Sequence, residues 1–333
     1  MDIGGYLQEL PVIWILLSMS VSIVILVKGA DWTIDGAVRI ASRLRLSKII
    51  IGATIVSLGT TTPEMVVSVT AAWLGNPALA LGNGVGSIIC DTGLIFGLSC
   101  IMSPIPIDYY ILNRTGWAQV GAATLLVAIC MWELSFGSAP PTLSRQVGFL
   151  FLVLLLCYLY ASYRWARWNR TFTTFQIPGD HPSILPSLLL LCSGLGMVIA
   201  GSRILVPSAS ECARRAGVPE DVIAATMVAF GTSLPELMTA VSAVRKGHPE
   251  IMIGNVVGAD VLNCLFVIGA AAAANPLPVS KSFFTFHFPA MLLILYSFRV
   301  FIFMDNEGFF KRWQGAWIFA IYLAYLTLQY SLG

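Results

Sequence analysis

The chain of 333 residues is 57% hydrophobic and 11% charged, with a formal net charge of +2. Soluble domains carry roughly 25% charged residues, so this composition excludes an ordinary soluble protein. The seven cysteines show no CxxC or metal-binding spacing. We therefore expect an integral membrane protein that contacts the lipid bilayer, with no nucleic-acid partner and no cofactor.

Segments of about 20 mostly apolar residues are long enough to cross a hydrocarbon layer of about 30 Å. Alternating strand patterns of the membrane-barrel kind are absent, and helices satisfy their own backbone hydrogen bonds in lipid. The expected fold class is therefore an all-α membrane protein with ten transmembrane helices. The ten segments lie near 12–30, 48–73, 78–101, 116–134, 146–164, 183–206, 219–244, 250–274, 283–303 and 314–331.

Lys and Arg are unevenly divided between the connections: fourteen lie on the side of the odd-to-even connections and five on the other side. Cytoplasmic loops accumulate these residues. The distribution predicts a multi-pass protein of the cell inner (cytoplasmic) membrane with both termini outside. Because Asp2 and Glu9 precede the first apolar run and no basic n-region is present, we do not expect a cleavable signal peptide.

Residues 52–97 align without a gap with residues 224–269, at a constant offset of 172, and 16 of these 46 positions are identical. Five helices per copy place the second copy in the membrane with the opposite orientation, the inverted-repeat plan of many secondary transporters. We predict a first five-helix repeat over 1–164, a short cytoplasmic linker over 165–182 and a second, inverted repeat over 183–333. The binding site of such a protein lies where the repeats meet, near the membrane midplane.

The repeated motif reads Gly-Thr-Thr-Thr-Pro-Glu in the first copy and Gly-Thr-Ser-Leu-Pro-Glu in the second, and it places Glu64 and Glu236 inside apolar segments. An ionised carboxylate there costs at least a few kcal/mol unless it is paired or solvated. No Lys or Arg lies nearby in the same helix. A bound cation is the simplest compensation, and oxygen ligands suit hard cations such as Ca²⁺ or Na⁺.

Hydroxyl groups precede each glutamate by four and three residues, so they share its helix face. They belong to Thr60 and Thr61, and to Thr232 and Ser233. The motif prolines disturb the preceding turn and can free the carbonyls near 57–59 and 229–231 for an ion. The alternative is a kinked helix in which the hydroxyls only compensate the backbone.

The third and eighth segments supply a second polar face. Asn83, Ser87 and Asp91 recur every four residues, and their equivalents are Asn255, Ala259 and Asn263. Asp91 precedes an apolar run and has no packing rationale. Asp260 faces about a sixth of a turn away from Asn263, which leaves open a partner at the helix rim or a second ion position.

The paired motifs and the two Gly-Asn-x-Val-Gly segments resemble the alpha repeats of the calcium/cation antiporter superfamily, and the ten-helix inverted plan resembles its prokaryotic sodium/calcium exchangers. The resemblance is close over the motif segments. It implies that Glu64, Glu236, Thr60 and Thr232 hold Ca²⁺. Around them it places Thr61, Ser233, Ser57, Ala229, Ser87, Asp91 and Asn263, as ligands of Ca²⁺ or of neighbouring Na⁺ ions.

Two departures from the family pattern bear on the coupling ion. Ala259 stands where the family usually has Ser, and Asp91 and Asn263 reverse the order of Asn and Asp that sodium-driven prokaryotic members favour. Proton-coupled branches of the superfamily have a motif that resembles Gly-Asn-x-x-Glu at this position. Both copies in this chain lack that Glu. We therefore expect a Ca²⁺/Na⁺ antiporter, with proton coupling as the alternative because Asp91 could carry a proton.

Alternating access would follow if bound ions neutralise the two glutamates and let the first and sixth helices slide past the motif core. The small-residue stretches 29–36 and 194–201 suit such sliding, although simple packing explains them equally well. A passive cation channel is a further alternative. An intramembrane hydrolase is not expected, because the sequence lacks a nucleophile with an adjacent base and a proton-sharing acid pair. We expect the protein to act as a monomer.

Overall fold

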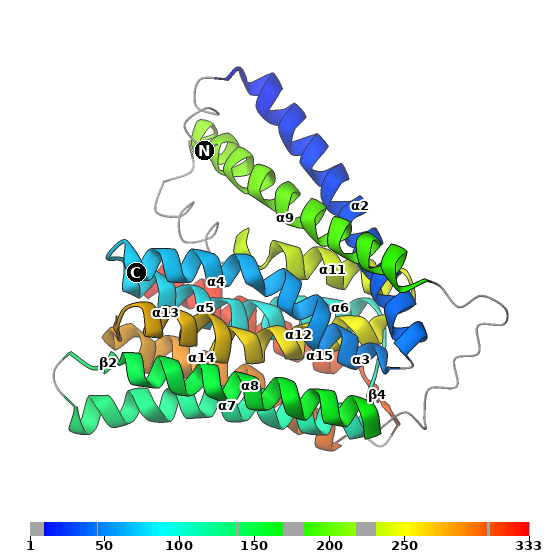
Figure 1. Cartoon of the computed structure of the whole chain (residues 1–333). Coiled ribbons are helices and arrows are strands. Elements are labelled where there is room, and N and C mark those ends of the chain that lie inside the picture. Colours follow the sequence, from blue (N-terminus) through cyan, green and yellow to red (C-terminus); the bar gives the residue numbers. More distant parts are fainter. Residues whose placement is uncertain are drawn as a thin grey trace.

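The computed structural model describes residues 10–332 apart from 45, 138–139, 169–182, 218–230 and 305–306. Over these residues the chain is helical, with four strands of two residues each. Eight of the described helices are long and apolar enough to cross a membrane. Figure 1 shows most helices running side by side in one bundle, while α2 and α9 cross this bundle obliquely on one side.

The helices of the first repeat follow the expected order. The second helix is continuous through α3, η1 and α4, and the third is continuous through α5, η2 and α6; η marks a π-helical segment. The bounds are α2 (Val12–Leu44), α3 (Lys48–Ile51), η1 (Gly52–Val56), α4 (Ser57–Trp73), α5 (Pro77–Cys90), η2 (Asp91–Phe96), α6 (Gly97–Met102), α7 (Tyr109–Phe136) and α8 (Arg145–Trp168).

The second repeat has the same plan, and the first part of its second helix, 218–230, lies outside the described residues. Most of the expected linker, 169–182, also lies outside them. The bounds are α9 (Ile184–Arg215), α11 (Leu234–Arg245), α12 (Pro249–Leu262), η3 (Asn263–Ile268), α13 (Gly269–Ala274), η4 (Phe283–His287), α14 (Phe288–Met304) and α15 (Arg312–Leu332).

Three helices are longer than the apolar segments predict. α2 continues to Leu44 and α9 to Arg215. The prediction ended both helices too early because their C-terminal halves carry charged residues, which a search for apolar segments excludes. α7 begins at Tyr109, where the Asp108 side chain accepts a hydrogen bond of 3.1 Å from the Ile111 N–H. Such an N-cap satisfies a free backbone donor and fixes the start of a helix.

Two strand pairs link the repeats. β1 (Ile105–Pro106) pairs antiparallel with β4 (Phe309–Phe310), and β2 (Thr142–Leu143) pairs with β3 (Leu277–Pro278). β1 and β3 occupy equivalent positions, because they too are 172 residues apart. In each pair, the strand after the third helix of one repeat meets the strand between the fourth and fifth helices of the other, so the two repeats interlock.

The fifth helix of each repeat packs against the third helix of the other. A Cβ atom added at Gly97 in α6 would lie 3.2 Å from the carbonyl oxygen of Gly315 in α15, and one at Gly269 in α13 would lie 3.4 Å from that of Gly148 in α8. Glycine permits these close backbone approaches. The interlocked packing holds α4, α5, α11 and α12 at the centre of the bundle.

Glycines also bring α2 and α9 together. A Cβ at Gly29 would lie 2.9 Å from the carbonyl oxygen of Gly194, and one at Gly194 would lie 2.7 Å from that of Gly29. α2 is tied to α11 by polar contacts, in which Ser242 Oγ donates to Asp31 Oδ1 (2.7 Å) and Lys246 Nζ pairs with Asp35 Oδ1 (2.7 Å). The glycines thus pack the two oblique helices on each other.

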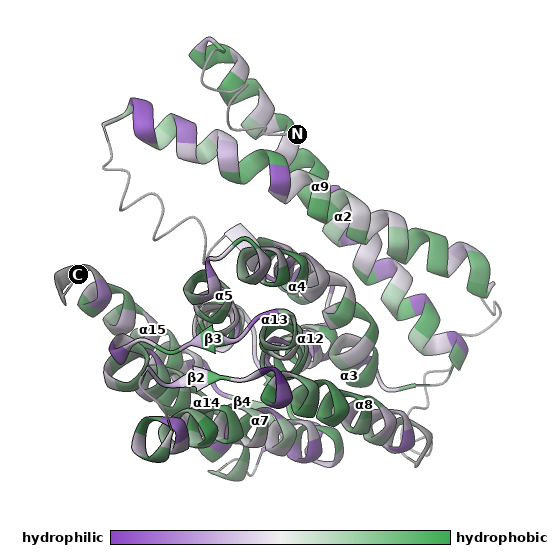
Figure 2. Ribbon diagram, turned by 60° about the vertical axis from the view of Figure 1, so that its left-hand side comes forward, coloured by the Kyte–Doolittle hydropathy of each residue, from purple (hydrophilic) through white to green (hydrophobic). Residues whose placement is uncertain are grey.

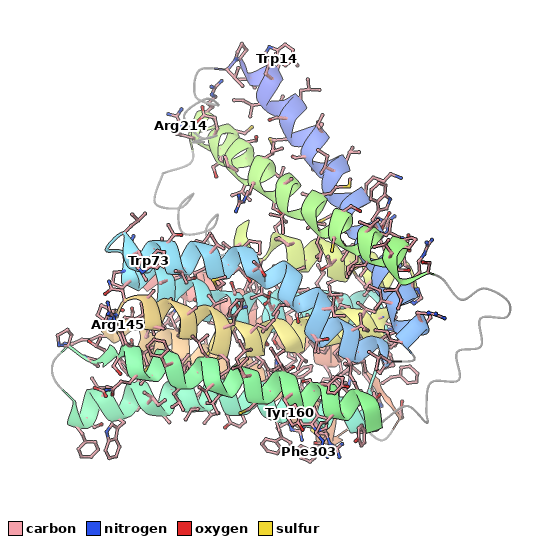
Figure 3. All side chains as sticks on the ribbon, in the orientation of Figure 1. Trp14, Trp73, Arg145, Tyr160, Arg214 and Phe303 are labelled. Carbon is pink, nitrogen blue, oxygen red and sulfur yellow. The ribbon has the colours of Figure 1, made fainter. Side chains whose placement is uncertain are left out.

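Hydrophobic residues extend along most of the helices, as the ribbon colours of Figure 2 show, and many large apolar side chains are exposed. Large aromatic side chains stand out from the helices, among them the labelled Trp73, Tyr160 and Phe303 of Figure 3. Trp and Tyr are enriched at membrane interfaces, and exposed apolar helix faces suit the hydrocarbon layer. The chain is therefore a multi-pass membrane protein.

Candidate ion-binding site

The two motif glutamates lie at the centre of the bundle, on α4 and α11, and both are fully buried. Glu64 Oε1 accepts hydrogen bonds from Ser87 Oγ (2.8 Å) and Ser233 Oγ (3.2 Å). Glu236 Oε1 accepts one from Thr61 Oγ1 (3.2 Å). Each glutamate thus receives the motif hydroxyl of the other repeat. The sequence placed each hydroxyl beside the glutamate of its own helix, and the inverted packing exchanges these partners.

A second reciprocal pair surrounds the first. Thr232 Oγ1 donates to Asn83 Oδ1 (3.0 Å), and Thr60 Oγ1 lies 3.5 Å from Asn255 Oδ1. Thr60 also lies 3.2 Å from the carbonyl oxygen of Val56 and 3.3 Å from that of Ser57. Its hydroxyl therefore partly compensates the backbone of its own helix, as the kinked-helix alternative predicts. The equivalent carbonyl region, including Ala229, lies outside the described residues.

Asp91 and Asn263 are equivalent positions, 172 residues apart, and they contact each other: Asn263 Nδ2 donates to Asp91 Oδ2 at 3.3 Å. Each is the first residue of a π-helical segment, η2 or η3. The sequence placed both residues on the polar face but did not indicate the π segments. Such segments occur frequently at functional sites, because they displace the helix register locally.

Unpartnered oxygens remain throughout this buried centre. Among the described residues, no hydrogen-bond partner is present for one oxygen of Glu64, Glu236, Asp91 or Asn263. Buried polar atoms in proteins are nearly always hydrogen bonded or bound to an ion or water. Atoms of this kind, all oxygen, are the ligands that Ca²⁺ and Na⁺ use.

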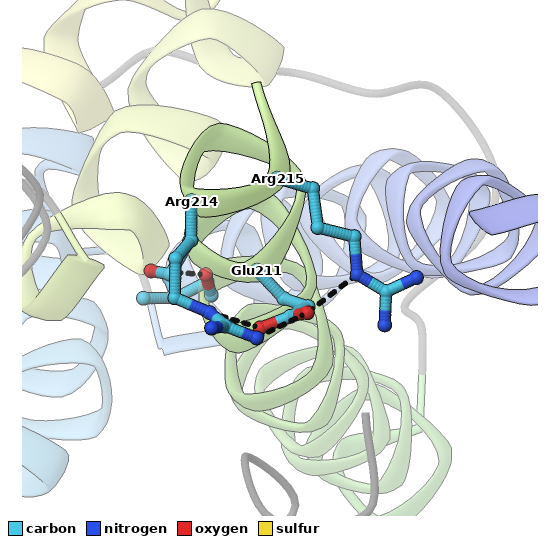
Figure 4. Close-up of polar contacts among 5 residues, drawn as sticks. Glu211, Arg214 and Arg215 are labelled. Atoms are coloured by element: carbon cyan, nitrogen blue, oxygen red, sulfur yellow. Dashed lines mark hydrogen bonds and ion pairs between the residues drawn. The ribbon is translucent and has the colours of Figure 1, made fainter. Parts of the chain in front are cut away.

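Basic side chains of the described residues do not pair with these carboxylates. Among the described residues, no ion pair includes Glu64, Glu236, Asp91 or Asp260. Elsewhere the chain does neutralise a buried acid in this way, because Glu211 near the end of α9 pairs with Arg214 (2.8 Å) and Arg215 (2.6 Å), as Figure 4 shows. Four buried acids without an ion pair in the described part of the chain are chemically suited to bind mobile cations.

The remaining predicted residues also lie near this centre. Ser87 and Ser233 both contact Glu64, and Ala259 contributes no hydroxyl at the position equivalent to Ser87. Ser57 is buried, and its hydroxyl lies 3.3 Å from the carbonyl oxygen of Thr54. The Ser57 side chain therefore bonds to its own helix rather than to a glutamate.

The sequence did not single out two residues that meet Asp260. Thr92 Oγ1 and Gln119 Nε2 each lie 2.5 Å from Asp260 Oδ2. Thr92 directly follows Asp91, and Gln119 is an amide within the fourth apolar segment. A polar residue inside an apolar segment was the one available signal. Asp260 therefore has hydrogen-bond partners on both η2 and α7.

The family described as "Sodium/calcium exchanger protein" matches the chain twice, over residues 14–164 and 186–331. Sodium/calcium exchanger MaX1 of Methanosarcina acetivorans is 28% identical over 95% of this chain and 98% of its own length. Inner membrane protein YrbG of Escherichia coli is 29% identical over 82% of this chain and 84% of its own. A solved structure of the sodium-calcium exchanger NCX_Mj, soaked with Na⁺ and Sr²⁺, matches with a TM-score of 0.80 and 28% identity. It covers 95% of this chain and 99% of that one.

The two family matches cover one repeat each, and the structural match extends over nearly the whole chain. Together they confirm the ten-helix fold of two inverted repeats. They also place the protein among transporters, which excludes the hydrolase. The chain therefore belongs to the sodium/calcium exchanger family.

Proposed function

We propose that the protein exchanges Ca²⁺ for Na⁺ across the inner (cytoplasmic) membrane by alternating access. The observation that carries the proposal is the reciprocal arrangement of Glu64 and Glu236. Each is buried, receives a hydroxyl from the opposite repeat and keeps one oxygen without a partner among the described residues. Relatives named as sodium/calcium exchangers support the choice of ions.

In this proposal Ca²⁺ binds between the two glutamates, whose paired charges match a divalent cation. Motif hydroxyls and carbonyls complete its shell, and Na⁺ ions occupy positions beside them. The proposed ligands are Glu64, Glu236, Thr60, Thr232, Thr61, Ser233, Ser57, Ala229, Ser87, Asp91 and Asn263. Ser57 would contribute through its carbonyl, because its hydroxyl bonds to its own helix.

Exchange rather than leak follows from the charge of the empty site. Closing the protein over two unpaired carboxylates is costly, so the empty carrier does not cross between states. When ions neutralise the site, α2 and α9 slide across the bundle and expose the other side. The direct packing of Gly29 on Gly194 supports movement of the two helices as a pair.

The test is ⁴⁵Ca²⁺ uptake into proteoliposomes loaded with Na⁺, with a parallel set that carries only a pH gradient. Uptake is expected to require internal Na⁺ and to be lost in Glu64→Gln. Uptake driven by the pH gradient alone would assign proton coupling, and uptake with no counter-ion demand would assign a channel.

In the proposed function the protein acts as a monomer with both termini on the outside of the membrane. The excess of Lys and Arg on one side supports both termini outside, and the name of the relative YrbG supports the inner membrane. The site is formed within one chain, which supports function as a monomer. Cysteine labelling near each terminus in intact cells tests the orientation.

A further inference from the structure

Asp260, Thr92 and Gln119 form a buried polar cluster beside the proposed site, which we call the Asp260 cluster. The three side chains come from α12, η2 and α7 and expose 1% or less of their surface. Asp260 Oδ2 accepts from Thr92 and Gln119 at 2.5 Å each, and Gln119 Nε2 lies 3.2 Å from Thr92 Oγ1. None of the three belongs to the ligand set above.

The cluster leaves oxygens that point to a ligand. Among the described residues, Asp260 Oδ1 and Gln119 Oε1 have no hydrogen-bond partner. The carboxylate also has no ion pair in the described part of the chain. A buried carboxylate with unused acceptor capacity and no cationic partner calls for a cation.

The other repeat shows that the fold does not require this polarity. At the same offset of 172, the equivalents of Asp260, Thr92 and Gln119 are Ile88, Cys264 and Met291. These equivalents are also buried. An apolar trio therefore fills the same layer on one side of the molecule, while an acid, a hydroxyl and an amide fill it on the other. Polarity that packing does not need indicates a binding role.

The position of the cluster connects it with ion exchange. Thr92 directly follows Asp91, and Asp260 lies one helical turn before Asn263. The Asp260–Thr92 contact is therefore adjacent to the Asp91–Asn263 contact. The cluster carries one formal charge, which one monovalent ion balances and a divalent ion exceeds.

We propose that the Asp260 cluster is a further binding position for a monovalent metal cation, with Na⁺ as its ligand, formed by Asp260, Thr92 and Gln119. This inference rests on the proposed function for its role in transport, because an ion held there is carried with the others. In the second repeat, the carboxylate of Asp260 takes the place of the hydroxyl that is missing at the neighbouring Ala259.

The test measures ²²Na⁺ binding to the purified full-length protein by scintillation proximity, alongside ⁴⁵Ca²⁺ binding. Asp260→Asn keeps the shape and an acceptor oxygen but removes the charge. The variant is expected to lose a single bound Na⁺ and to retain Ca²⁺ binding. Thr115→Val is the matched control, because Thr115 is buried in the same helix as Gln119 and its hydroxyl bonds to the Ile111 carbonyl at 3.0 Å.

A second variant keeps the test decisive if Asp260→Asn does not fold. Gln119→Leu removes the amide oxygen but not the charge, and it is expected to weaken Na⁺ binding several-fold without a change in Ca²⁺ binding. Na⁺ binding equal to that of the parent in either folded variant overturns the inference. The inference is also overturned if Asp260→Asn binds as much Na⁺ as the parent while its exchange loses its pH dependence. Asp260 would then carry a proton rather than Na⁺.

The binding assay separates this inference from the proposed function. A parent protein that binds Na⁺ through Asp260 but shows no Na⁺-driven Ca²⁺ uptake would refute the exchange proposal alone. A parent that exchanges the two ions, with Asp260→Asn binding as much Na⁺ as the parent, would refute the inference alone.

Discussion

The two repeats share one arrangement of helices but differ in the side chains that lie beside the motif glutamates. Both place a Pro-Glu pair, a preceding hydroxyl and an asparagine at equivalent positions, and both begin a π segment at Asp91 or Asn263. They differ at the layer beside the glutamates, where Ser87 faces Glu64 but Ala259 stands at its equivalent. The shared residues form the reciprocal contacts, whereas each acid beside them, Asp91 in the first repeat and Asp260 in the second, has no acidic equivalent in the other repeat.

This difference suits two kinds of ion site, one for a divalent ion and one for monovalent ions. In the proposed exchanger, a divalent ion between Glu64 and Glu236 would need both halves equally, which requires duplicated ligands. Monovalent ions beside it would not need symmetric ligands, and the residues beside the glutamates are where the repeats differ. Changes at the residues that the repeats share should therefore have larger effects on transport than changes where the repeats differ.

The largest effect is expected from the two glutamates. Glu64→Gln and Glu236→Gln should each lower ⁴⁵Ca²⁺ uptake by about 100-fold or more, because losing a charged ligand costs about 3 kcal/mol. Glu307→Gln is the control, since this glutamate is exposed and pairs with Lys311 at 2.6 Å. One glutamate that proves dispensable would break the symmetry of the divalent site.

The Asp91–Asn263 pair should tolerate exchange of its members. Asp91→Asn removes the only charge of the pair, and Asn263→Asp places a second carboxylate next to the first, so each single change should reduce Na⁺-driven uptake by about 10-fold. The double variant Asp91→Asn with Asn263→Asp restores one acid and one amide across the 3.3 Å contact. Uptake by the double variant should exceed that of either single variant, and a double variant as poor as the worse single one would mean that the acid is needed in the first repeat.

A smaller effect is expected where one repeat lacks a hydroxyl. Ala259→Ser introduces the group that Ser87 supplies to Glu64 at 2.8 Å. It should lower the Na⁺ concentration for half-maximal uptake by about 2- to 5-fold, because one hydrogen bond or ligand is worth about 1 kcal/mol. Ser87→Ala should raise that concentration. Equal Na⁺ dependence in all three proteins would remove the hydroxyl from the monovalent site.

The smallest effect concerns a titratable residue found in one repeat. His248 precedes α12 where Asn76 precedes α5, and its Nδ1 lies 2.9 Å from Lys48 Nζ. Partial burial and the Lys48 charge lower the pKa of His248 below its ordinary value of about 6.5.

The direction of the resulting pH dependence follows from linkage. As the pH falls through about 6.5, the unfolded chain binds a proton before the folded one, so His248 lowers stability progressively toward its folded pKa. His248→Asn should reduce the acid-induced drop in Tm between pH 7.5 and 5.5 by about 1 °C. Thermal unfolding of the detergent-purified protein measures this. A parent and variant with the same drop would show that His248 contributes nothing.

The ten helices could be predicted because lipid imposes an apolar length on each of them. The duplication also predicted the inverted plan, since an odd number of helices per copy reverses the second copy. The lengths of α2 and α9 could not be predicted in the same way. Their charged ends continue as helices and make contacts such as Asp35 of α2 with Lys246 and Glu211 of α9 with Arg214, which an apolar window does not detect.

For the site, the sequence predicted which residues gather but not which ones touch. Thr61 and Ser233 were expected beside the glutamate of their own helix, and the interlocked repeats instead direct them to the opposite one. The π segments beginning at Asp91 and Asn263 leave no compositional signal. Gln119 was missed because a single amide in an apolar segment gives no hint of its partner on another helix.

The contact between Asp91 and Asn263 has a consequence for how such a molecule could be assembled. Positions that are equivalent and also touch each other lie on the axis relating the two halves. In a dimer of two identical halves this position would face its own copy, so it would hold either two acids or none. Joining both halves in one polypeptide allows one acid to face one amide at this position, an asymmetric pair that two identical subunits cannot encode.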